Sequence, residues 1–420
     1  MRPISNSFIP NFEKDDISLI LKLLFRPQLW QKGRFIEILE KTFARKFSFK
    51  YSFAFNSGRS ALLAILKAIE LKENQEVFLQ SFTCNAAVNP ILALKGKPIF
   101  VDLDQNLNLS PDDLRKKIES SKKPKAIIVQ HTFGWPSQIE KIKKIAQEKK
   151  LFLIEDCAHS LGTKYQNQYL GKFGDISFFS FGRDKVISSV YGGIVATDSD
   201  RLAEKISSFQ KKLSWPNNFW ICQNLCQPII FSISLPFYNF FNLGKILLYL
   251  ARKLKLITPA VYQVEKKGKL AKVFPKKMPN ALAVLALHQL KKLEKFNQHR
   301  KKIAEIYLKE LKGKKGIKVI FQEKENNYQP IFMRFPILVR KRKEILKELK
   351  KRNIYLEDGW SETPIVPKGS DLKKFFYQEN SCPRAEKIVK EIINLPTNIK
   401  ISEKEAKKIG EMIIKFSSLD

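Results

Sequence analysis

The sequence predicts an α/β protein with a large, mostly parallel sheet covered by helices, followed by a smaller α+β domain. Between residues 51 and 198, short apolar segments alternate with amphipathic segments whose apolar residues recur three and four positions apart. The apolar segments lack the polar alternation of half-exposed strands, which indicates strands buried on both faces. After residue 311, a few further strands and helices form a separate, mixed region.

The first half of the chain supplies the large domain, residues 1–212. Two amphipathic helices, 13–25 and 34–47, precede a short apolar strand, 51–55. That strand ends at Asn56-Ser57-Gly58, where a polar residue and a glycine permit a turn into the next helix. The same pattern then repeats along the chain. It predicts helix 59–71, strand 76–80, helix 84–96, strand 97–104, helix 110–120, strand 125–131, helix 137–150 and strands 151–156, 175–181 and 192–198.

A hydrophobic and basic insertion, 213–270, interrupts this pattern. No charged residue occurs between Leu213 and Gly244, and a basic amphipathic segment, 245–256, follows. One interpretation is peripheral contact of 213–256 with the inner face of a membrane, with aromatic rings at headgroup depth and lysines beside acidic lipids. The other is a helical hairpin packed against its own domain or a second subunit. Pro228 and Pro236 argue against a spanning helix.

The pattern in the rest of the chain predicts a connecting segment and a second domain. Residues 271–310 carry the connection, a long helix expected over 280–311. Residues 311–420 form the small α+β domain. Its expected elements are strand 332–339, helix 341–352, strand 353–358 and helices 383–393 and 402–416.

The cysteines and the amino-terminal residues limit the metal sites, disulfides and cellular location that we expect. The five cysteines form no CxxC pair and have no matching histidine cluster, which argues against a zinc site or a disulfide framework. We therefore expect no bound metal and a reducing, cytoplasmic location. The first residues also lack the apolar stretch of a signal peptide.

The formal net charge of +35 invites a nucleic-acid interpretation. Against it, lysine far outnumbers arginine, and the lysines are spread along amphipathic helices. No zinc finger, RNA-binding aromatic motif or basic zipper occurs. We expect no nucleic-acid partner, because anionic small substrates or an acidic membrane surface fit such a charge better.

Polar side chains follow three of the predicted strands. His131 and Asp156 stand at the ends of strands 125–131 and 151–156, and Lys185 follows strand 175–181. Ligands of open α/β sheets bind beyond the carboxyl ends of the strands. We therefore expect these side chains to lie at one edge of the sheet.

A phosphate site is expected at the start of helix 59–71. Ser57 and Gly58 precede this helix, whose first-turn amides and dipole favour an anion, and glycine lets a phosphate approach the backbone. Such helix starts are common, so the motif alone is weak. Ser180, five residues before Lys185, is placed to donate to a phosphate oxygen.

Asp156, His159 and Lys185 suggest chemistry on a heteroaromatic cofactor. A carboxylate beside a pyridine nitrogen keeps it protonated, and the cationic ring then accepts electrons from a carbanion. His159 would hydrogen-bond the cofactor or lie along its face. A lysine partly removed from water supplies a neutral amine that forms a Schiff base and moves a proton. The alternatives are an acid that caps a turn, a histidine satisfied in a loop and a solvated lysine.

These residues occur within segments that resemble the DegT/DnrJ/EryC1/StrS family of sugar aminotransferases, which use pyridoxal 5′-phosphate (PLP). The similarity runs from about Phe8 to Gln210 and from about Phe274 onward. It is most specific from "IIVQHTFG" through "LFLIEDCAHSLGTKY" to "GKFGDISFFSFGRDKVISSVYGGIVATD". It also includes "NSGRSALLAIL", "SFTCNAAVNPILALKGKPIFVDLD" and "CPRAEKIVKEIINLPTNIKISEKE".

The resemblance implies the fold of PLP-dependent transferases of type I, the aspartate-aminotransferase fold. It makes Lys185 the lysine that binds the cofactor aldehyde and Asp156 the partner of the ring nitrogen. His159 takes the place near the phenolic oxygen, while Ser180 and the amides of Gly58 and Arg59 hold the phosphate. It also implies a homodimer in which each active site is completed by the other subunit.

Three positions depart from the family pattern. After "SFT" the family often has an aromatic residue that stacks on the cofactor ring, and this chain has Cys84. Phe82 or His159 is the candidate to cover that face instead. Where many members carry Asn and Arg for a phosphate contact across the dimer, this chain has Pro275 and Lys277. Lysine keeps a point charge there but lacks the bidentate fork of arginine.

The resemblance implies an aminotransferase that moves an amino group from an amino acid, glutamate in the family, to a keto-sugar linked to a nucleotide. Such an activity serves surface polysaccharide or amino-sugar biosynthesis. One alternative is a PLP-dependent sugar dehydratase, in which histidine replaces the lysine, and Lys185 argues against it. Another is a non-catalytic or regulatory protein on the same fold. The intact set of Asp156, Ser180 and Lys185 argues against loss of catalysis.

Overall fold

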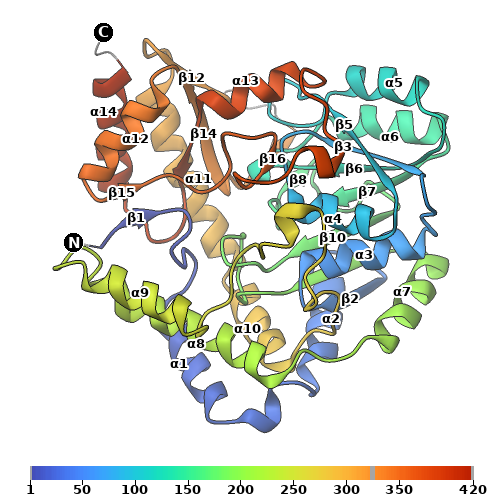
Figure 1. The fold of residues 1–420 in the computed structure, drawn as a ribbon, viewed down its shortest axis with the longest axis horizontal. Helices are drawn as coiled ribbons and strands as arrows, with labels where there is room; N and C mark the ends of the chain where they lie inside the picture. The colour runs from blue at the N-terminus through green and yellow to red at the C-terminus, as the bar shows by residue number, and fades with distance from the viewer. Residues whose placement is uncertain (1, 322–326, 418–420) are drawn as a thin grey trace.

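A seven-stranded sheet forms the centre of the large domain in the computed structural model, which describes residues 2–321 and 327–417 (Figure 1). Five neighbouring strands run parallel, and β11 pairs antiparallel with both of its neighbours. This arrangement confirms the predicted mostly parallel sheet. Across the sheet, the strands are β2 (Tyr51–Phe55), β11 (Gly193–Thr197), β10 (Ile176–Ser180), β7 (Phe152–Asp156), β6 (Pro124–Gln130), β3 (Glu76–Gln80) and β5 (Lys97–Val101).

Helices cover both faces of this sheet, as the apolar strands predict. On one face, α5 (Pro111–Glu119) and α6 (Ile139–Glu148) bury Leu114 and Ile142 against alternate strand residues such as Ile127. The next residue along β6, Ile128, belongs to the core on the other face. There α3 (Gly58–Ala68) packs, flanked by α4 (Asn85–Ala93) and α7 (Asp200–Lys212), and α1 (Lys14–Leu24) and α2 (Phe35–Lys46) contribute to the same core.

The segment expected as an insertion forms two helices, α8 (Asn218–Ser234) and α9 (Leu243–Lys253); α8 lies against α1 and α10, and α9 packs on α8 (Figure 1). Helix α8 buries Trp220, Leu225 and Phe231 against the domain. Most of α9 is exposed. Within the described residues, no helix has both the length and the apolar character needed to cross a membrane.

The long helix expected over 280–311 is two helices, α10 (Asn280–Lys291) and α11 (Leu293–Leu311). The two helices meet at Lys292, which belongs to neither of them and whose ammonium group binds the carboxylates of Asp15 and Asp16. A periodic apolar pattern continues through this break, so the sequence shows one helix where there are two.

The small domain has its own core and an antiparallel sheet of β12 (Ile317–Val319), β14 (Arg334–Val339) and β17 (Ile392–Pro396). The expectation that Ile392 and Ile393 continue a helix is wrong, because both lie in β17. Helices α12 (Arg342–Lys351), α13 (Pro383–Glu391) and α14 (Glu403–Ser417) accompany this sheet.

Short strand pairings join the domains. Strand β15 (Ile354–Tyr355) pairs with β1 (Ile4–Ser5), and β16 (Ile365–Val366) pairs with β4 (Thr83–Cys84). The strand expected over 353–358 is therefore limited to two residues. The second pairing brings the small domain to the residue that precedes α4. A further small sheet joins β8 (Lys164–Tyr165), β9 (Gln168–Tyr169) and β13 (Tyr328–Gln329).

Candidate active site

Two neighbouring strands bring three predicted site residues, Asp156, Ser180 and Lys185, to their carboxyl ends. Asp156 ends β7, and the register pairs it with Phe178, two residues before Ser180 at the end of β10. Because β7 and β10 are parallel, their carboxyl ends meet at one edge of the sheet. Lys185 lies in the loop that returns to β11. The strand topology thus gathers three of the predicted site residues.

The loop that carries Lys185 is held from the amino-terminal segment and from α11. The side-chain amide of Asn11 donates to the carbonyl of Lys185. Arg300 on α11 donates to Asn11 Oδ1 over 2.7 Å and to the carbonyl of Val186 over 2.6 Å. Burial lowers the pKa of the Arg300 guanidinium to about 9. These contacts fix the backbone from which the lysine side chain projects.

The amine of Lys185 contacts His159, with 2.9 Å between Nζ and Nε2. The His159 ring is stacked on Phe133, with 5.5 Å between the ring centroids. Trp360 meets its edge at 4.7 Å. Burial, together with the charges of Lys185 and Arg334, holds the pKa of His159 well below its usual range. His159 is therefore neutral near pH 7 and contacts the amine without adding a second positive charge.

Asp156 is a buried carboxyl group, 5% exposed. Its Oδ1 accepts a hydrogen bond from the amide of Ala158 over 2.9 Å. Burial raises the pKa of Asp156 to about 6, although the Ala158 amide and the charge of Lys185 oppose the shift. A buried carboxylate of this kind has a strong electrostatic preference for a cationic partner.

His131, which the sequence places at a neighbouring strand end, is held within the protein. Its Nε2 lies 3.1 Å from Glu155 Oε2, and its Nδ1 contacts Ser137 at 3.2 Å. The imidazole is completely buried. Glu155 in turn accepts hydrogen bonds from the amides of Gly171, Phe173 and Gly174. These contacts give His131 a structural role at the site edge.

The start of α3 forms a cradle beside Ser180. Ser57 caps the helix, accepting a hydrogen bond from the amide of Ser60. A Cβ atom at Gly58 would stand 3.2 Å from Ser180 Cβ, and one at Gly182 would stand 3.5 Å from Ser180 Oγ. Two glycines therefore leave the space around the Ser180 hydroxyl clear. The amides of Gly58 and Arg59, a hydroxyl and a nearby amine suit a phosphate.

The Arg59 side chain leaves this cradle, whereas its backbone stays in the first turn of α3. Its Nε lies 2.7 Å from the buried carboxylate of Glu265, and its Nη2 donates to the carbonyl of Ala260 over 2.7 Å. The guanidinium also lies 4.9 Å from the centre of the Phe274 ring. A contact of Arg59 with a phosphate would therefore run through its amide, as the sequence analysis expects.

Cys84 lies within electrostatic reach of Arg59 and Lys185, and its Sγ accepts a hydrogen bond from the amide of Ala86 at the start of α4. Burial raises the pKa of the thiol, while the charges of Arg59 and Lys185 act in the opposite direction. Cys84 has no ring to stack. Phe82, one of the two residues expected to cover the cofactor ring in its place, is fully buried and meets Trp360 edge-on at 5.4 Å between ring centroids.

Two residues near the lysine were not anticipated. Trp360, from the small domain, contacts the His159 ring, and its own ring centre lies 5.8 Å from Lys185 Nζ. Arg334 on β14 bridges Asp184, the residue before the lysine, at 2.6 Å and Asp358 at 2.9 Å. Only the pairing of distant segments brings these side chains together, so local sequence patterns do not mark them.

Lys277, which the family resemblance places where many members carry an arginine, lies near Trp215 in this chain. Its Nζ is 5.3 Å from the centre of the Trp215 ring, and its amide donates to the carbonyl of Ser214. Pro275 lines a surface groove with Leu63 and Phe209.

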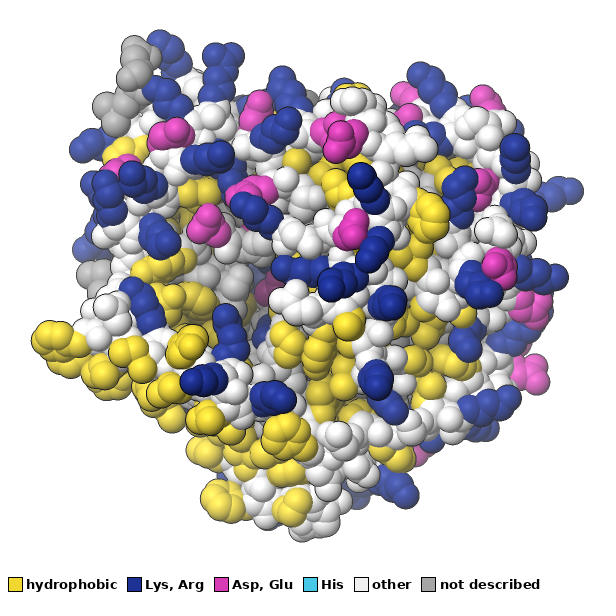
Figure 2. All heavy atoms as spheres, in the orientation of Figure 1, with side chains coloured by type: hydrophobic (Ala, Val, Ile, Leu, Met, Phe, Trp, Pro, Cys, Tyr) yellow, Lys and Arg dark blue, Asp and Glu magenta, His cyan; other side chains and the backbone are white. Residues whose placement is uncertain are grey.

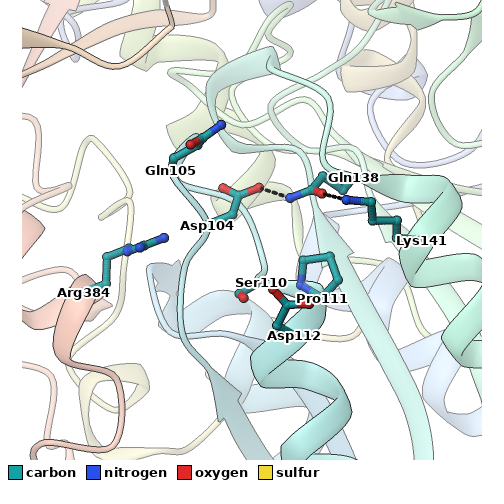
Figure 3. A pocket seen from close by; sticks show the side chains of 8 residues that line it. All are labelled: Asp104, Gln105, Ser110, Pro111, Asp112, Gln138, Lys141 and Arg384. Carbon is teal, nitrogen blue, oxygen red and sulfur yellow. Dashed lines mark hydrogen bonds between the residues drawn. The ribbon is translucent and has the colours of Figure 1, made fainter.

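A separate polar pocket opens near the start of α5 (Figure 3). Gln138 donates to Asp104 and accepts from Lys141, while Arg384 approaches from α13 (Figure 3). Burial raises the pKa of Asp104. Its lining contains none of the predicted site residues: Asp104, Gln105, Ser110, Pro111, Asp112, Gln138, Lys141 and Arg384.

The site has places for three chemical groups of a ligand. A phosphate would fit the glycine-lined start of α3 beside Ser180, a ring cation would satisfy the buried carboxyl group of Asp156, and an aldehyde would meet the amine of Lys185. PLP carries these three groups on one ring. The residues present therefore fit this cofactor.

Comparisons with known proteins agree with this geometry. The model of the DegT/DnrJ/EryC1/StrS aminotransferase family matches residues 11–217 and 251–414. GDP-perosamine synthase of Escherichia coli O157:H7 is 29% identical over 390 residues, which cover 92% of this chain and 91% of that protein.

Solved structures show the same fold. Helicobacter pylori PseC, an aminotransferase involved in the biosynthesis of pseudoaminic acid, superimposes with a TM-score of 0.73 at 21% identity and covers 97% of both chains. Streptococcus pneumoniae Spr1654, solved in a PLP-form, gives a TM-score of 0.73 at 19% identity, covering 99% of this chain and 97% of that one. The chain belongs to the DegT/DnrJ/EryC1/StrS family, whose members are PLP-dependent sugar aminotransferases.

Proposed function

We propose that this protein transfers an amino group from an amino acid, glutamate by preference, to a keto-sugar carried on a nucleoside diphosphate. The observation that supports the proposal most strongly is the contact between Lys185 and neutral His159 beside the buried carboxyl group of Asp156. The relatives named above act in the biosynthesis of GDP-perosamine and of pseudoaminic acid. A related substrate would place this chain in surface polysaccharide or amino-sugar biosynthesis.

The proposed roles divide among the residues of the site. PLP, when bound, withdraws electrons from the carbon next to the transferred nitrogen. Asp156 keeps the ring nitrogen protonated, because its buried carboxylate is stabilised by a cation. Lys185 holds the aldehyde before the reaction and moves a proton at its Nζ during each half of the transfer. Ser57, Ser180 and the first-turn amides of α3 hold the phosphate, and His159 and Cys84 border the ring.

The charge of the chain favours the proposed substrate. A diphosphate is attracted to a protein with a formal net charge of +35, and such attraction raises association rates at low ionic strength. This long-range effect does not choose one sugar over another. That choice depends on short-range contacts around Trp360 and Lys185.

We also propose that the protein acts as a cytoplasmic homodimer with shared active sites. The family resemblance supports this assembly. Lys277, which replaces an arginine used across the dimer by many members, would keep a single positive charge there. No nucleic-acid partner is proposed, because the positive charge is distributed over helices without a recognition motif.

A spectral screen tests the proposed activity. Full-length protein loaded with PLP is mixed in turn with GDP-, UDP- and TDP-linked amino sugars, and the absorbance of the bound aldehyde form is followed. The proposal predicts that one amino sugar converts it to the amine form, and that glutamate does so from the donor side. The parent sugars without an amine serve as the matched control.

Two outcomes would contradict the proposal. Conversion by amino acids but by no amino sugar would point to a different acceptor. A spectrum unchanged by every amine would favour the non-catalytic alternative.

A further inference from the structure

Helix α9 and the turn before it present a hydrophobic surface to solvent. Figure 2 shows hydrophobic side chains gathered along the edge where Figure 1 places α9. Phe241 is 81% exposed and Leu254 is 64% exposed, values unusual for large apolar side chains. We call this surface the α9 face; it consists of Phe237, Phe240, Phe241, Leu243, Ile246, Leu247, Leu250 and Leu254.

The α9 face is one side of an amphipathic helix. Residues 243, 247, 250 and 254 recur at helical spacing and share a side of α9. The buried residues of this helix, Gly244 and Ala251, lie toward α8 instead. A Cβ atom at Gly244 would stand 2.1 Å from the carbonyl of Ser234, so close packing against α8 is built into that position. Helix α9 is thus fixed to the protein by one side while a second apolar side is left uncovered.

Positive charge surrounds the α9 face. The exposed residues Lys245, Arg252, Lys253 and Lys255 lie on or just after α9. No aspartate or glutamate occurs between Lys205 and Val264. An apolar stripe bordered by cations, on a segment without acids, complements the boundary between acyl chains and anionic headgroups.

The α9 face lies largely outside the part of the chain that the family model matches. The family model matches 11–217 and resumes at residue 251, so α8 and most of α9 lie outside it. An exposed apolar patch in a segment that the family model does not match indicates a binding function of its own.

We propose that the α9 face docks on the surface of a bilayer that contains anionic lipids. The helix lies in the plane of the interface, with Phe240 and Phe241 inserted and the basic residues beside the headgroups. Helix α9 has 11 residues, and α8 has 17 with Pro228 inside it, so both are too short to span the hydrocarbon core. This proposal does not depend on the identity of the sugar substrate.

The charges around the α9 face favour an anionic lipid surface over a second copy of the chain. In a twofold interface each α9 face would meet its own copy. Lys245, Arg252, Lys253 and Lys255 would then approach the same cations, without an acidic residue in 205–264 to pair with them. Anionic headgroups remove this repulsion.

Flotation with vesicles tests the proposal. Full-length protein is incubated with vesicles of phosphatidylcholine alone and with vesicles of equal parts phosphatidylcholine and phosphatidylglycerol. We expect the protein to float with the anionic vesicles. Replacing Phe240 and Phe241 by serine should abolish flotation. Replacing Arg252, Lys253 and Lys255 by glutamine should weaken partitioning by roughly a hundredfold.

Matched variants separate this surface from general hydrophobicity and charge. Phe376→Asn removes an aromatic ring that is 58% exposed, as Phe240 is, from the small domain. Lys404→Gln with Lys407→Gln and Lys408→Gln removes three exposed charges from α14. Both controls should float like the wild type. Far-ultraviolet circular dichroism verifies that every variant is folded.

Three results would overturn the proposal. The wild type could fail to float with either kind of vesicle. The α14 charge variant could lose as much binding as the α9 charge variant, which would assign binding to net charge. Light scattering could show that Phe240→Ser with Phe241→Ser dissociates a protein oligomer while flotation is unchanged, which would assign the face to a second copy.

Discussion

Asp156 couples cofactor binding to pH through its buried carboxyl group. Its pKa is raised by burial from 3.8 to about 6, so between these values the folded protein binds more protons than the unfolded chain. The free energy of unfolding of the cofactor-free protein should therefore fall as pH rises from about 4 to about 6. The total loss should be about 3 kcal/mol.

The variant Asp156→Asn should remove this pH-dependent fall in the free energy of unfolding, because asparagine does not ionise. Denaturant unfolding of the cofactor-free proteins should show the variant more stable than the wild type by about 3 kcal/mol near pH 8, with no difference below about pH 4. Adding PLP should reverse the order near pH 8, because a ring cation stabilises the carboxylate. Asp112→Asn, at an exposed position in α5, is the control and should show neither effect. A constant difference at every pH would contradict the assigned burial.

At the scale of elements, the start of α3 is fastened by a buried ion pair. Arg59 in its first turn pairs with Glu265 in the short 3₁₀ helix Glu265–Lys267, and neither side chain is more than 9% exposed. Glu265 Oε2 also accepts a hydrogen bond from the amide of Tyr262 over 2.8 Å. The segment that follows the α8–α9 hairpin is thereby joined to the phosphate cradle.

Glu265→Gln should lower the free energy of unfolding by about 3–5 kcal/mol, because it leaves the Arg59 guanidinium buried without a countercharge. Denaturant titration measures the change, and PLP titration should show weaker binding as α3 loses its anchor. The matched control is Glu37→Gln, which breaks the exposed pair with Lys41 on α2 and should leave the stability nearly unchanged. Equal stability of both variants would show that the buried pair does not hold α3.

The elements that the sequence predicts well are those with a single strong pattern. Apolar strands and amphipathic helices gave the alternating order of the large domain, because both faces of the sheet are covered. The pattern fails where two elements share one periodicity. Ile392 and Ile393 continue the apolar spacing of α13 yet pair with β14, and the break at Lys292 depends on carboxylates from α1.

The candidate site also contains residues that the sequence predicts and residues that it does not. Asp156, Ser180 and Lys185 were predictable because strand ends meet at one edge of a parallel sheet. Trp360 and Arg334 were not, because the small domain that delivers them folds from residues far along the chain. For α9, periodicity revealed an amphipathic helix but not which of its sides the protein covers.

At the scale of the whole molecule, the two domains meet around the lysine. Arg334 from the small domain binds Asp184 beside Lys185, and Trp360 covers His159. The core of the large domain also extends into the small domain through Trp360, Ile365 and Val389, so apolar packing and these polar contacts together join the domains at the site.

The proposed homodimer gives a prediction for the intact protein. Size-exclusion chromatography with light scattering should give twice the 48.7 kDa mass of the chain. The mass should persist when Phe240 and Phe241 are replaced by serine, because we assign the α9 face to lipid. A monomer at working concentrations would contradict the shared active site.

The central claim is that Lys185 binds the cofactor aldehyde while Asp156 holds its ring nitrogen. Borohydride reduction of the full-length protein loaded with PLP, followed by peptide mass mapping, tests it most directly. The phosphopyridoxyl group should be recovered on the peptide that contains Lys185, and Lys185→Arg should remove it while the protein stays folded. Recovery of the group on another lysine, with Lys185 unmodified, would contradict the account.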